Sequence, residues 1–481
     1  MELATVSKMF CACRNRFGDP PNSNVCPVCL GMPGVLPVMN RQAYEFAVRV
    51  GMALNCKIAP YTKWDRKGYY YPDLPKNYQI SQYDLPLSSN GYIDLLLDGQ
   101  TKRVGIIRAH LEEDAGKNVH DLADSGCTGV DLNRAGVPLL EIVSEPDMYS
   151  SEEVMAYARA MRQLVRYLGV SEANMQQGHM RFEPNISLWI FDEAEPDGGH
   201  YTPIVEVKNL NSFRSLERTV TFEIERQGGE WQADRQGYRM DKMSKQNRGW
   251  DDDQEVTVYQ RHKEEADEYR YFPEPDLLPV EIDDAWLGKI HSQIPESPTA
   301  RYARFQKDYG LDAKLAGLLV SERATADYFE ATIQAGGSSK RTANLIQSHG
   351  LRLANERGTD VAKLGISPER LAELCNLADE EKISASVAGT IFEAMGESDD
   401  SPEKIAEDRN LMQVSDVSAL ESVVKEVLAD NAKAVDDYKS GGKKAKKARG
   451  FLLGQVMQKS KGQANPKVAG ELIDRKVLSQ D

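Results

Sequence analysis

The sequence predicts an α+β fold, in which a mixed, largely antiparallel domain precedes two all-helical domains. Nineteen of the 22 prolines lie before residue 300, and all five tryptophans lie at or before Trp286. In this first part, strand-like and helix-like runs mix without a regular β-α-β rhythm, which favours an antiparallel sheet. After about residue 295, apolar residues recur at helical spacing. Because 481 residues suggest roughly two to four domains, we expect domains at 1–292, 293–400 and 401–481.

Three runs in the first part are typical of strands, because they are short, apolar or β-branched, and bounded by turn residues. They are RVGIIRAH at 103–110, PLLEIVSE at 138–145 and TPIVEVKNL at 202–210. The run Glu152–Leu168 has apolar residues at 3.6-residue spacing and predicts a helix.

Three later helices have recognisable starts, because a serine that can cap a helix comes directly before a proline. These starts are Ser297-Pro298, Ser367-Pro368 and Ser401-Pro402. The polar run GESDDSPE at 396–403 is typical of a linker, so we expect the two helical domains to meet there.

The composition is that of a globular protein of the cytoplasm. The chain has no run of about 18 apolar residues that could cross a membrane, and its first residues, MELATVSKMF, do not resemble a signal peptide. Its seven cysteines are an odd number and four of them fall within the first thirty residues, which favours a metal site in a reducing compartment over disulfides. The net charge of −15 does not exclude RNA binding, because local patches decide contact.

The four early cysteines form two closely spaced pairs that predict a zinc knuckle at 11–29. Cys11 and Cys13 are separated by one residue, Cys26 and Cys29 by two, and twelve residues lie between the pairs. Two tight turns with this spacing can hold Zn²⁺ in a tetrahedral site of four thiolates. Such a site has no open position, so its role would be structural. The alternative is four buried thiols without a metal.

Two acidic runs are candidates for a magnesium site. The sequence lacks a phosphate-binding loop of the form G-x-x-x-x-G-K-[ST], so any ATP must be held by other chemistry. The run 110–117, HLEEDAGK, contains His110, Glu113 and Lys117, and a second run contains Glu141. Carboxylates on separate strands can converge on Mg²⁺, and a lysine can neutralise phosphate charge. By spacing alone, a solvated acidic face is the more usual explanation of such runs.

Two further polar runs could contribute to the same site. Arg181, Glu183, Asn185 and Ser187 alternate, so a strand would point all four to one face. Lys208 begins a polar run between a predicted strand and a helix, where an anion could bind at the helix N-terminus. An exposed polar sheet face and an ordinary helix cap are the alternatives.

Several longer motifs resemble one family throughout the chain, the B subunits of the aspartyl/glutamyl-tRNA(Asn/Gln) amidotransferase complex called GatCAB. The two most specific motifs are YYPDLPK at 70–76 and QISQ at 79–82. The other matching runs are SKMFCAC, PNSNVCPVCLGMPGVLPVMN, HLEEDAGK, DLNRAGVPLLEIVSEPD, VEVKNLNSFRSLE, EYRYFPEPDL, NAKAVDDYKSG and GFLLGQVMQKSKGQANP.

The resemblance implies a fold and a reaction. The fold would be a cradle domain similar to the catalytic fold of glutamine synthetase, then a helical domain and a YqeY-like tail domain that binds tRNA. The subunit would use ATP and Mg²⁺ to phosphorylate the side-chain carboxylate of glutamate or aspartate on misacylated tRNA. An amidase-type A subunit would supply ammonia from glutamine through a tunnel, and a small C subunit would join the two.

The resemblance also assigns roles to individual residues. Glu113 and Glu141 match metal-binding carboxylates of the family, and Glu183 stands where the family usually has aspartate. We therefore count these three as catalytic candidates, with Glu113 and Glu141 as magnesium ligands. The candidates for binding ATP are His110, Lys117, Arg181 and Lys208.

The family usually begins with a strand that carries a Glu-x-His pair, and this sequence starts just after that point. A misplaced start codon is the expected explanation. The competing possibility is a zinc-stabilised, tRNA-binding subunit whose phosphorylation is impaired or absent. A stand-alone carboxylate–amine ligase is less expected, because the chain carries no glutaminase nucleophile motif.

The tail contains a basic segment that is typical of contacts to RNA phosphates. Pattern alone would equally allow a solvated flexible face, whereas the resemblance favours tRNA. The candidate tRNA-binding residues are Lys443, Lys444, Lys446, Lys447 and Arg449.

Overall fold

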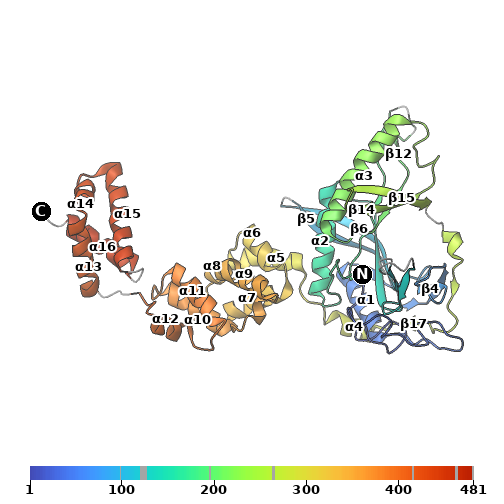
Figure 1. The fold of residues 1–481 in the computed structure, drawn as a ribbon, viewed down its shortest axis with the longest axis horizontal. Coiled ribbons are helices and arrows are strands. Elements are labelled where there is room, and N and C mark those ends of the chain that lie inside the picture. Colours follow the sequence, from blue (N-terminus) through green and yellow to red (C-terminus); the bar gives the residue numbers. More distant parts are fainter. Residues whose placement is uncertain are drawn as a thin grey trace. The chain divides into compact units, whose positions relative to one another are not determined.

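The computed structural model describes residues 1–97, 99–119, 127–193, 195, 197–262, 266–413, 417–460 and 464–478. The side chains at 262, 266, 267, 417–419, 443 and 478 also lie outside the description. The chain divides into two compact units, Met1–Thr299 and Ala300–Asp481 (Figure 1). The first unit mixes strands with helices and the second contains helices, which confirms the predicted α+β class.

The central sheet of the first unit is antiparallel and has the strand order β1-β5-β6-β9. Its strands are β1 (Lys57–Ile58), β5 (Ser88–Leu97), β6 (Gln100–Glu113) and β9 (Pro138–Ser144). The runs predicted as strands at 103–110 and 138–145 form most of β6 and β9. Their pairing joins segments about thirty residues apart in the chain.

Two amphipathic helices pack on this sheet, and each begins at a side-chain cap. They are α1 (Arg41–Ala53) and α2 (Ser151–Tyr167). Asn40 caps α1 by accepting hydrogen bonds from two backbone N–H groups, and Ser150 caps α2 in the same way with one. The apolar faces of both helices enter a core with Leu111 and Leu140 of the sheet. The predicted helix at 152–168 is confirmed within one residue at each end.

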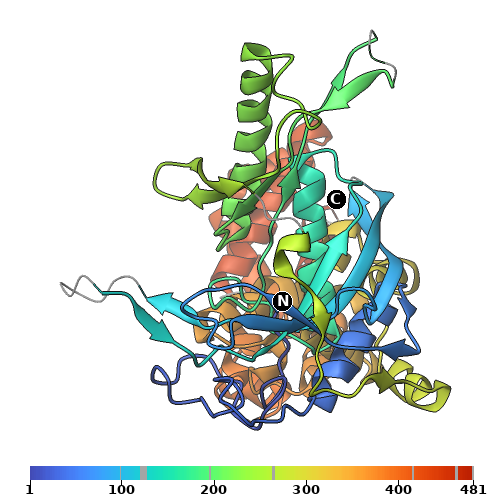
Figure 2. The same cartoon turned by 90° about the vertical axis from the view of Figure 1, so that its right-hand side faces the viewer.

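A second sheet of the first unit is mixed, with the order β10-β13-β14-β15 and one parallel pair, β13 with β14. Its strands are β10 (Asn185–Ile186), β13 (Val205–Lys208), β14 (Gln246–Asp251) and β15 (Val256–His262). The long helix α3 (Phe213–Ala233) packs against it, as Figures 1 and 2 show. The predicted strand at 202–210 is confirmed as β13. Of the alternating run at 181–187, only Asn185–Ile186 forms a strand.

Smaller elements complete the first unit. One three-stranded sheet has the order β16-β3-β4, and the remaining strands pair as β17-β2, β7-β8 and β11-β12. Their bounds are β2 (Tyr61–Thr62), β3 (Asp65–Gly68), β4 (Tyr78–Ser81), β7 (Lys117–Val119), β8 (Gly129–Asp131), β11 (Trp189–Phe191), β12 (Gly199–Tyr201), β16 (Phe272–Pro273) and β17 (Val280–Glu281), with η1 (Ala266–Tyr269) and α4 (Asp284–His291).

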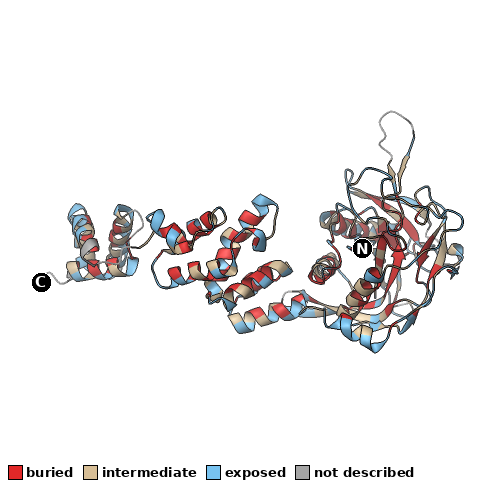
Figure 3. Cartoon of the chain, turned by 90° about the horizontal axis from the view of Figure 1, so that it is seen from below, coloured by how far each residue is buried: buried red, intermediate tan, exposed pale blue. Residues whose placement is uncertain are grey.

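The second unit contains two separate apolar cores (Figure 3). The helices of the first core are α5 (Pro298–Tyr309), α6 (Ala313–Leu319), α7 (Arg323–Gln334), α8 (Ser339–Leu345), α9 (Leu351–Arg357), α10 (Pro368–Asp379), α11 (Ala385–Met395) and α12 (Pro402–Asp408), with η2 (Ile346–Gly350) and η3 (Val361–Lys363). Those of the second are α13 (Val417–Asp430), α14 (Ala432–Lys439), α15 (Gly442–Lys459) and α16 (Pro466–Leu478).

The predicted serine–proline helix starts are confirmed, because α5, α10 and α12 each begin at the predicted proline. The segment 396–403 is not a free linker, however. The Arg370 guanidinium donates hydrogen bonds to the carbonyls of Ser398 and Asp400, both at 2.6 Å. Ile405 and Ala406 of α12 are buried in the first helical core, so the change of core falls after α12 rather than at residue 400.

No helix in the described part of the chain is both long enough and apolar enough to cross a membrane.

Candidate active site

An acidic cluster forms where β6 and β9 pair. Side chains alternate between the two faces of a strand, so His110 and Glu112 leave β6 on one face while Leu111 and Glu113 leave it on the other. Glu141 of β9 lies directly opposite His110 in the ladder and shares its face. The ligand atoms of His110, Glu112 and Glu141 all lie within 4.8 Å of one another, which makes this acidic cluster a candidate cation site.

Burial controls the charge of the acidic cluster. It lowers the pKa of His110 to about 4, so the imidazole is neutral, and its Nδ1 is buried without a hydrogen-bond partner among the described residues. Burial and the charge of Glu141 raise the pKa of Glu112 to about 7. For Glu141, burial acts against ionisation, but the charges of the cationic side chains around it, Lys67 and Arg108, lower its pKa. A neutral imidazole beside two carboxylates is a donor set that a divalent cation can use.

One cationic side chain near the acidic cluster comes from a different sheet. Lys67 lies on β3, and although burial acts to lower its pKa, the charges of Glu112 and Glu141 raise it. Tyr271, which follows η1, is also adjacent, since burial and the same two carboxylates raise the pKa of its hydroxyl. The pairing of β3 with β16 brings these residues together from positions about 200 apart in the sequence.

A second charged group adjoins the acidic cluster on the same side of the sheet. Asp114, the residue after β6, forms ion pairs with Arg181 and with Arg134. Arg181 also contacts Glu2 at 3.1 Å. Burial and Asp114 raise the pKa of Glu2 to about 8, so its protonated carboxyl donates a hydrogen bond to the ionised Asp114. Arg181 and Arg134 therefore offset the negative charge of this second group.

Lys208 and Glu183 lie beside this charged face. Lys208 ends β13, and its Nζ is 3.1 Å from Glu206 and 3.4 Å from Glu183. The charge of Lys208 also acts on Lys67, and that of Glu183 acts on Arg181, so both residues lie near cations that surround the acidic cluster. Lys208 therefore lies where it could neutralise an anion, whereas Glu183 is half-exposed at the edge.

The structure does not bring Glu113 or Lys117 to the acidic cluster. Glu113 leaves the opposite face of β6, where its carboxylate pairs with Lys76 and accepts a hydrogen bond from the Ile80 backbone N–H at 2.9 Å. Glu112, its neighbour, occupies the position that the sequence interpretation gave to Glu113. Lys117 is exposed on the β7–β8 hairpin, because the chain turns away from the sheet after Asp114.

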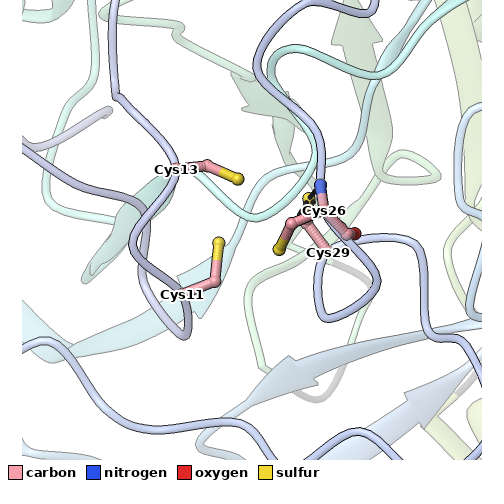
Figure 4. A group of neighbouring side chains, drawn as sticks. All are labelled: Cys11, Cys13, Cys26 and Cys29. Atoms are coloured by element: carbon pink, nitrogen blue, oxygen red, sulfur yellow. Dashed lines mark hydrogen bonds between the residues drawn. The ribbon is translucent and has the colours of Figure 1, made fainter.

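The four predicted cysteines converge as expected (Figure 4). Cys11 and Cys13 come from one segment, Cys26 and Cys29 from a facing turn, and all four sulfur atoms lie within 4.8 Å of one another. A hydrogen bond from Cys11 lowers the pKa of Cys29 to about 4, and the same contact raises the pKa of Cys11. The backbone N–H of Cys26 donates to Cys29 Sγ at 3.0 Å. The donor set fits zinc.

The tail residues predicted to bind tRNA divide into two groups. Lys444, Lys446 and Lys447 are exposed on α15, where they are available to phosphates. Arg449 instead donates two hydrogen bonds to Asp474 of α16, at 2.7 and 2.8 Å, and so joins two helices. The side chain of Lys443 lies outside the described residues.

Sequence reasoning missed several residues of the charged face. Those not selected are Glu2, Lys67, Glu112, Asp114 and Arg134. The available signal was the alternation of side chains along a strand. His110 and Glu141 are both candidates from the sequence, and of the adjacent Glu112 and Glu113 only Glu112 shares the face of His110 on β6. No local signal marks Lys67 or Arg134, because their contacts depend on the tertiary fold.

Comparison with known proteins assigns both parts of the chain. Residues 1–288 match the family model described as the GatB/GatE catalytic domain. Residues 327–477 match the model described as the GatB domain. The acidic cluster and the four cysteines lie within the first match, and the exposed lysines of α15 lie within the second.

Three curated relatives are similar over nearly their whole length, and each is named as the B subunit of an aspartyl/glutamyl-tRNA(Asn/Gln) amidotransferase. The protein of Carboxydothermus hydrogenoformans is 45% identical, with 99% of this chain and 97% of the relative covered. That of Thermomicrobium roseum is 48% identical, with 98% and 96% covered. That of Geobacter sulfurreducens is 45% identical, with 99% and 97% covered. This chain therefore belongs to the family of aspartyl/glutamyl-tRNA(Asn/Gln) amidotransferase B subunits.

Proposed function

We propose that this chain is the ATP-using, tRNA-binding subunit of an enzyme that converts Glu-tRNA(Gln) or Asp-tRNA(Asn), or both, to the amidated tRNA. The observation that carries the proposal is the acidic cluster, in which His110 and Glu112 are buried and Glu141 is partly buried, in a protein whose relatives are named for this reaction. A buried group of carboxylates is costly to maintain unless it holds a cation or performs chemistry.

The reaction needs an activated acid, because a carboxylate is a poor electrophile. A side-chain carboxylate oxygen of the tRNA-bound glutamate or aspartate attacks the γ-phosphorus of ATP, and ADP leaves. Ammonia then attacks the carbonyl carbon of the acyl phosphate, the C–O bond to phosphate breaks, and the amide remains after loss of a proton. The protein's part is to align the two substrates and balance the charge that moves between them.

Glu112 and Glu141 would hold Mg²⁺, and the chemistry of their oxygen atoms fits that ion. The bound ion would neutralise charge on the phosphates of ATP. His110 can serve as a third ligand or orient a water, because its neutral imidazole offers a buried Nδ1 that has no hydrogen-bond partner in the described part of the chain. Glu113 is not proposed as a ligand, since it faces Lys76 on the other side of the strand.

Cationic side chains around the acidic cluster would bind the phosphates. Lys67 and Lys208 are the candidates for direct contact with the phosphates. Lys67 lies close to Glu112 and Glu141, and Lys208 lies close to Glu183. Arg181 is tied to Asp114 and Glu2, so its role would be to hold the second charged group in place. Glu183, at the half-exposed edge of the charged face, would then be the carboxylate that meets the substrates.

The remaining parts have supporting roles in this proposal. Zn²⁺ on Cys11, Cys13, Cys26 and Cys29 would be structural and would cross-link a loop-rich segment beside the sheet. Exposed Lys444, Lys446 and Lys447 would bind tRNA phosphates. An amidase-type A subunit would supply ammonia through a tunnel, with a small C subunit completing a cytoplasmic heterotrimer. The first unit would have the glutamine synthetase-like cradle fold.

The test is transamidation by the complex reconstituted from this chain and its A and C subunits. Glu-tRNA(Gln), ATP, Mg²⁺ and glutamine are supplied, and Gln-tRNA(Gln) and ADP are measured. We expect Glu141→Gln to lose both products while retaining tRNA binding. Glu172→Gln, on an exposed carboxylate paired with Arg166, is the matched control and should keep full activity. Full activity of Glu141→Gln would refute the proposed site.

The alternative functions predict different results in the same assay. A zinc-stabilised RNA-binding subunit would give no ADP with any variant. A stand-alone ligase would amidate without the A subunit when ammonium replaces glutamine and also when glutamine alone is present. The acidic cluster favours catalysis over RNA binding alone, because RNA binding would not require a buried acidic group.

A further inference from the structure

A row of tyrosines lies next to the acidic cluster, and the reaction proposed above gives none of them a role. Successive ring centroids are 6.0 Å apart for Tyr71 and Tyr69, 6.2 Å for Tyr69 and Tyr269, and 6.0 Å for Tyr269 and Tyr271. The last ring stacks on Tyr83 at 4.0 Å with an interplanar angle of 9°. We call these five residues the tyrosine row.

The tyrosine row is assembled from segments that are distant in sequence. Tyr69 and Tyr71 follow β3, Tyr83 follows β4, and Tyr269 and Tyr271 flank the end of η1. The strand order β16-β3-β4 brings the three segments side by side. Tyr271 lies at the acidic cluster, whereas Tyr71 and Tyr83 remain 46% and 42% exposed. The row therefore has an exposed ring at each end, and Tyr271, next to one of these ends, lies beside the proposed reaction centre.

The local backbone is specialised to hold η1 close to β3. A Cβ on Gly68 would lie 3.2 Å from the Tyr269 carbonyl oxygen, tighter than ordinary contact. Arg270, between two tyrosines of the row, has φ of +49°, a left-handed conformation that a non-glycine residue rarely adopts. Strained backbone of this kind is concentrated at binding sites.

Cations accompany the rings. Lys67 Nζ lies 4.9 Å from the Tyr269 ring centroid, and the Arg261 guanidinium lies 5.8 Å from that of Tyr71. Arg270 lies 5.6 Å from the ring of Tyr70, which is 67% exposed. Aromatic rings alternating with cations are the usual platform for unpaired nucleotides, whose bases stack while their phosphates meet positive charge.

We propose that the tyrosine row binds the unpaired 3′-terminal nucleotides of tRNA by base stacking and so guides the aminoacylated adenosine to the acidic cluster. This inference rests on the proposed function, because it is the aminoacyl carboxylate that must reach the cluster. The adenine of ATP is the competing occupant. The single adenine of ATP would cover only one ring or one stacked pair. Five successive rings offer room for several bases and therefore match a short strand of nucleotides better.

The experiment measures the affinity of the full chain for uncharged tRNA(Gln), without ATP and without partner subunits. Two RNAs are compared: the complete tRNA and the same tRNA lacking its last three nucleotides. The variants are Tyr83→Leu and Tyr71→Leu, which remove exposed rings, and Tyr83→Phe, which keeps the ring. Tyr149→Leu is the matched control, since Tyr149 is 80% exposed and contacts Lys102 rather than the row.

We expect each leucine variant to weaken binding of the complete tRNA by about tenfold. Binding of the shortened tRNA should be the same for all variants, and Tyr83→Phe and Tyr149→Leu should match the unaltered chain. An equal loss for both RNAs, or no loss for the complete tRNA, would overturn the proposal. Weakened ATP binding with unchanged tRNA binding would assign the row to the nucleotide instead.

Failure of this inference can be told apart from failure of the proposed function. The binding assay needs no phosphorylation, so Glu141→Gln should bind complete tRNA as the unaltered chain does even if it amidates nothing. If the chain lacking both exposed rings amidates normally and binds tRNA with unchanged affinity, the proposed role of the tyrosine row is wrong and the proposed function still stands.

Discussion

His110 and Glu141 are direct partners across the antiparallel ladder of β6 and β9, and this register determines which neighbouring carboxylate joins them. Glu112 is two residues from His110 and shares its face, whereas Glu113 does not. We predict that Glu112→Gln lowers the rate of ATP-dependent amidation by about 100-fold, because it removes a ligand from the proposed magnesium site. The measurement is ADP formation by the reconstituted complex. A rate within a factor of two of the unaltered enzyme would exclude Glu112 as a ligand.

Substitution of Glu113 should lower the unfolding free energy of the protein. Its carboxylate and the ammonium of Lys76 are both nearly inaccessible, so Glu113→Gln leaves a buried charge without its partner. Breaking such a pair from one side costs about 3–5 kcal/mol of unfolding free energy. Urea unfolding of the first unit measures the loss. The double variant Glu113→Gln with Lys76→Met, which removes both charges, should recover most of it; failure to recover would show that the pair itself is not the cause.

Most of the fold was predictable because its signals are local. Serine–proline starts, strand-like runs and the 3.6-residue spacing of α2 lie within short segments, and each produced the predicted element. The segment 396–403 was misjudged as a linker because its polar composition gives no sign of Arg370, whose hydrogen bonds come from α10. Hydrogen bonds from a distant residue to backbone carbonyls cannot be predicted from the sequence of the segment that accepts them.

The site was predictable to the level of the segment and less so to the level of the side chain. The cysteine spacing was enough to predict that the four thiols converge, because both turns are short and each pair is local. The acidic site needed the register of β6 against β9, and the choice between two adjacent glutamates depended on it. Lys67 was missed because β3 reaches the cluster only through the β16-β3-β4 sheet.

Zinc should bind at the four cysteines and contribute to folding. We expect the purified chain to contain about one zinc ion, because four converging thiols form a closed tetrahedral site. Cys13→Ser should lower the zinc content to near zero, as measured by elemental analysis. Cys127→Ser is the control, since Cys127 is exposed and outside the cluster. Unchanged zinc in Cys13→Ser would rule out the site.

The ion pairs of Glu330 predict how the stability of the helical unit depends on pH. Burial acts against its ionisation, but hydrogen bonds from Arg304 and Arg301 lower its pKa below the ordinary value of 4.5. A lowered pKa contributes stability that is complete above 4.5 and is lost as the pH falls through the folded-state pKa. Glu330→Gln should therefore lower the unfolding free energy by about 3 kcal/mol at pH 7, and by progressively less toward pH 3.

Calorimetric unfolding of the full chain at several pH values checks this dependence. Glu356→Gln is the matched control, because Glu356 pairs with Arg352 at the surface and should change the free energy by less than about 1 kcal/mol. A difference between Glu330→Gln and the unaltered chain that stays constant from pH 7 to pH 3 would mean that ionisation of Glu330 is not the source of the stability.

The tail lysines should determine how tRNA binding responds to salt. Lys444, Lys446 and Lys447 are exposed on α15, and Lys443 precedes them on the same helix. Changing all four to alanine keeps helix propensity and removes the charges. Since each phosphate contact contributes about 0.9 to the slope of log affinity against log salt, we expect the slope to fall by up to about 3.6 for four lysines, and tRNA binding at low salt to weaken.

Two further variants separate charge from structure in the tail. Lys459→Ala removes a lysine that pairs with Glu426 and Asp430, so it should leave the salt slope unchanged. Arg449→Ala breaks the contacts to Asp474 and should lower the melting temperature of the tail, because Arg449 joins α15 to α16. Filter binding across a salt series measures the slope for every variant. An unchanged slope in the quadruple variant would move the tRNA contact away from α15, since release of counterions by these lysines is the only physical reason for the predicted change.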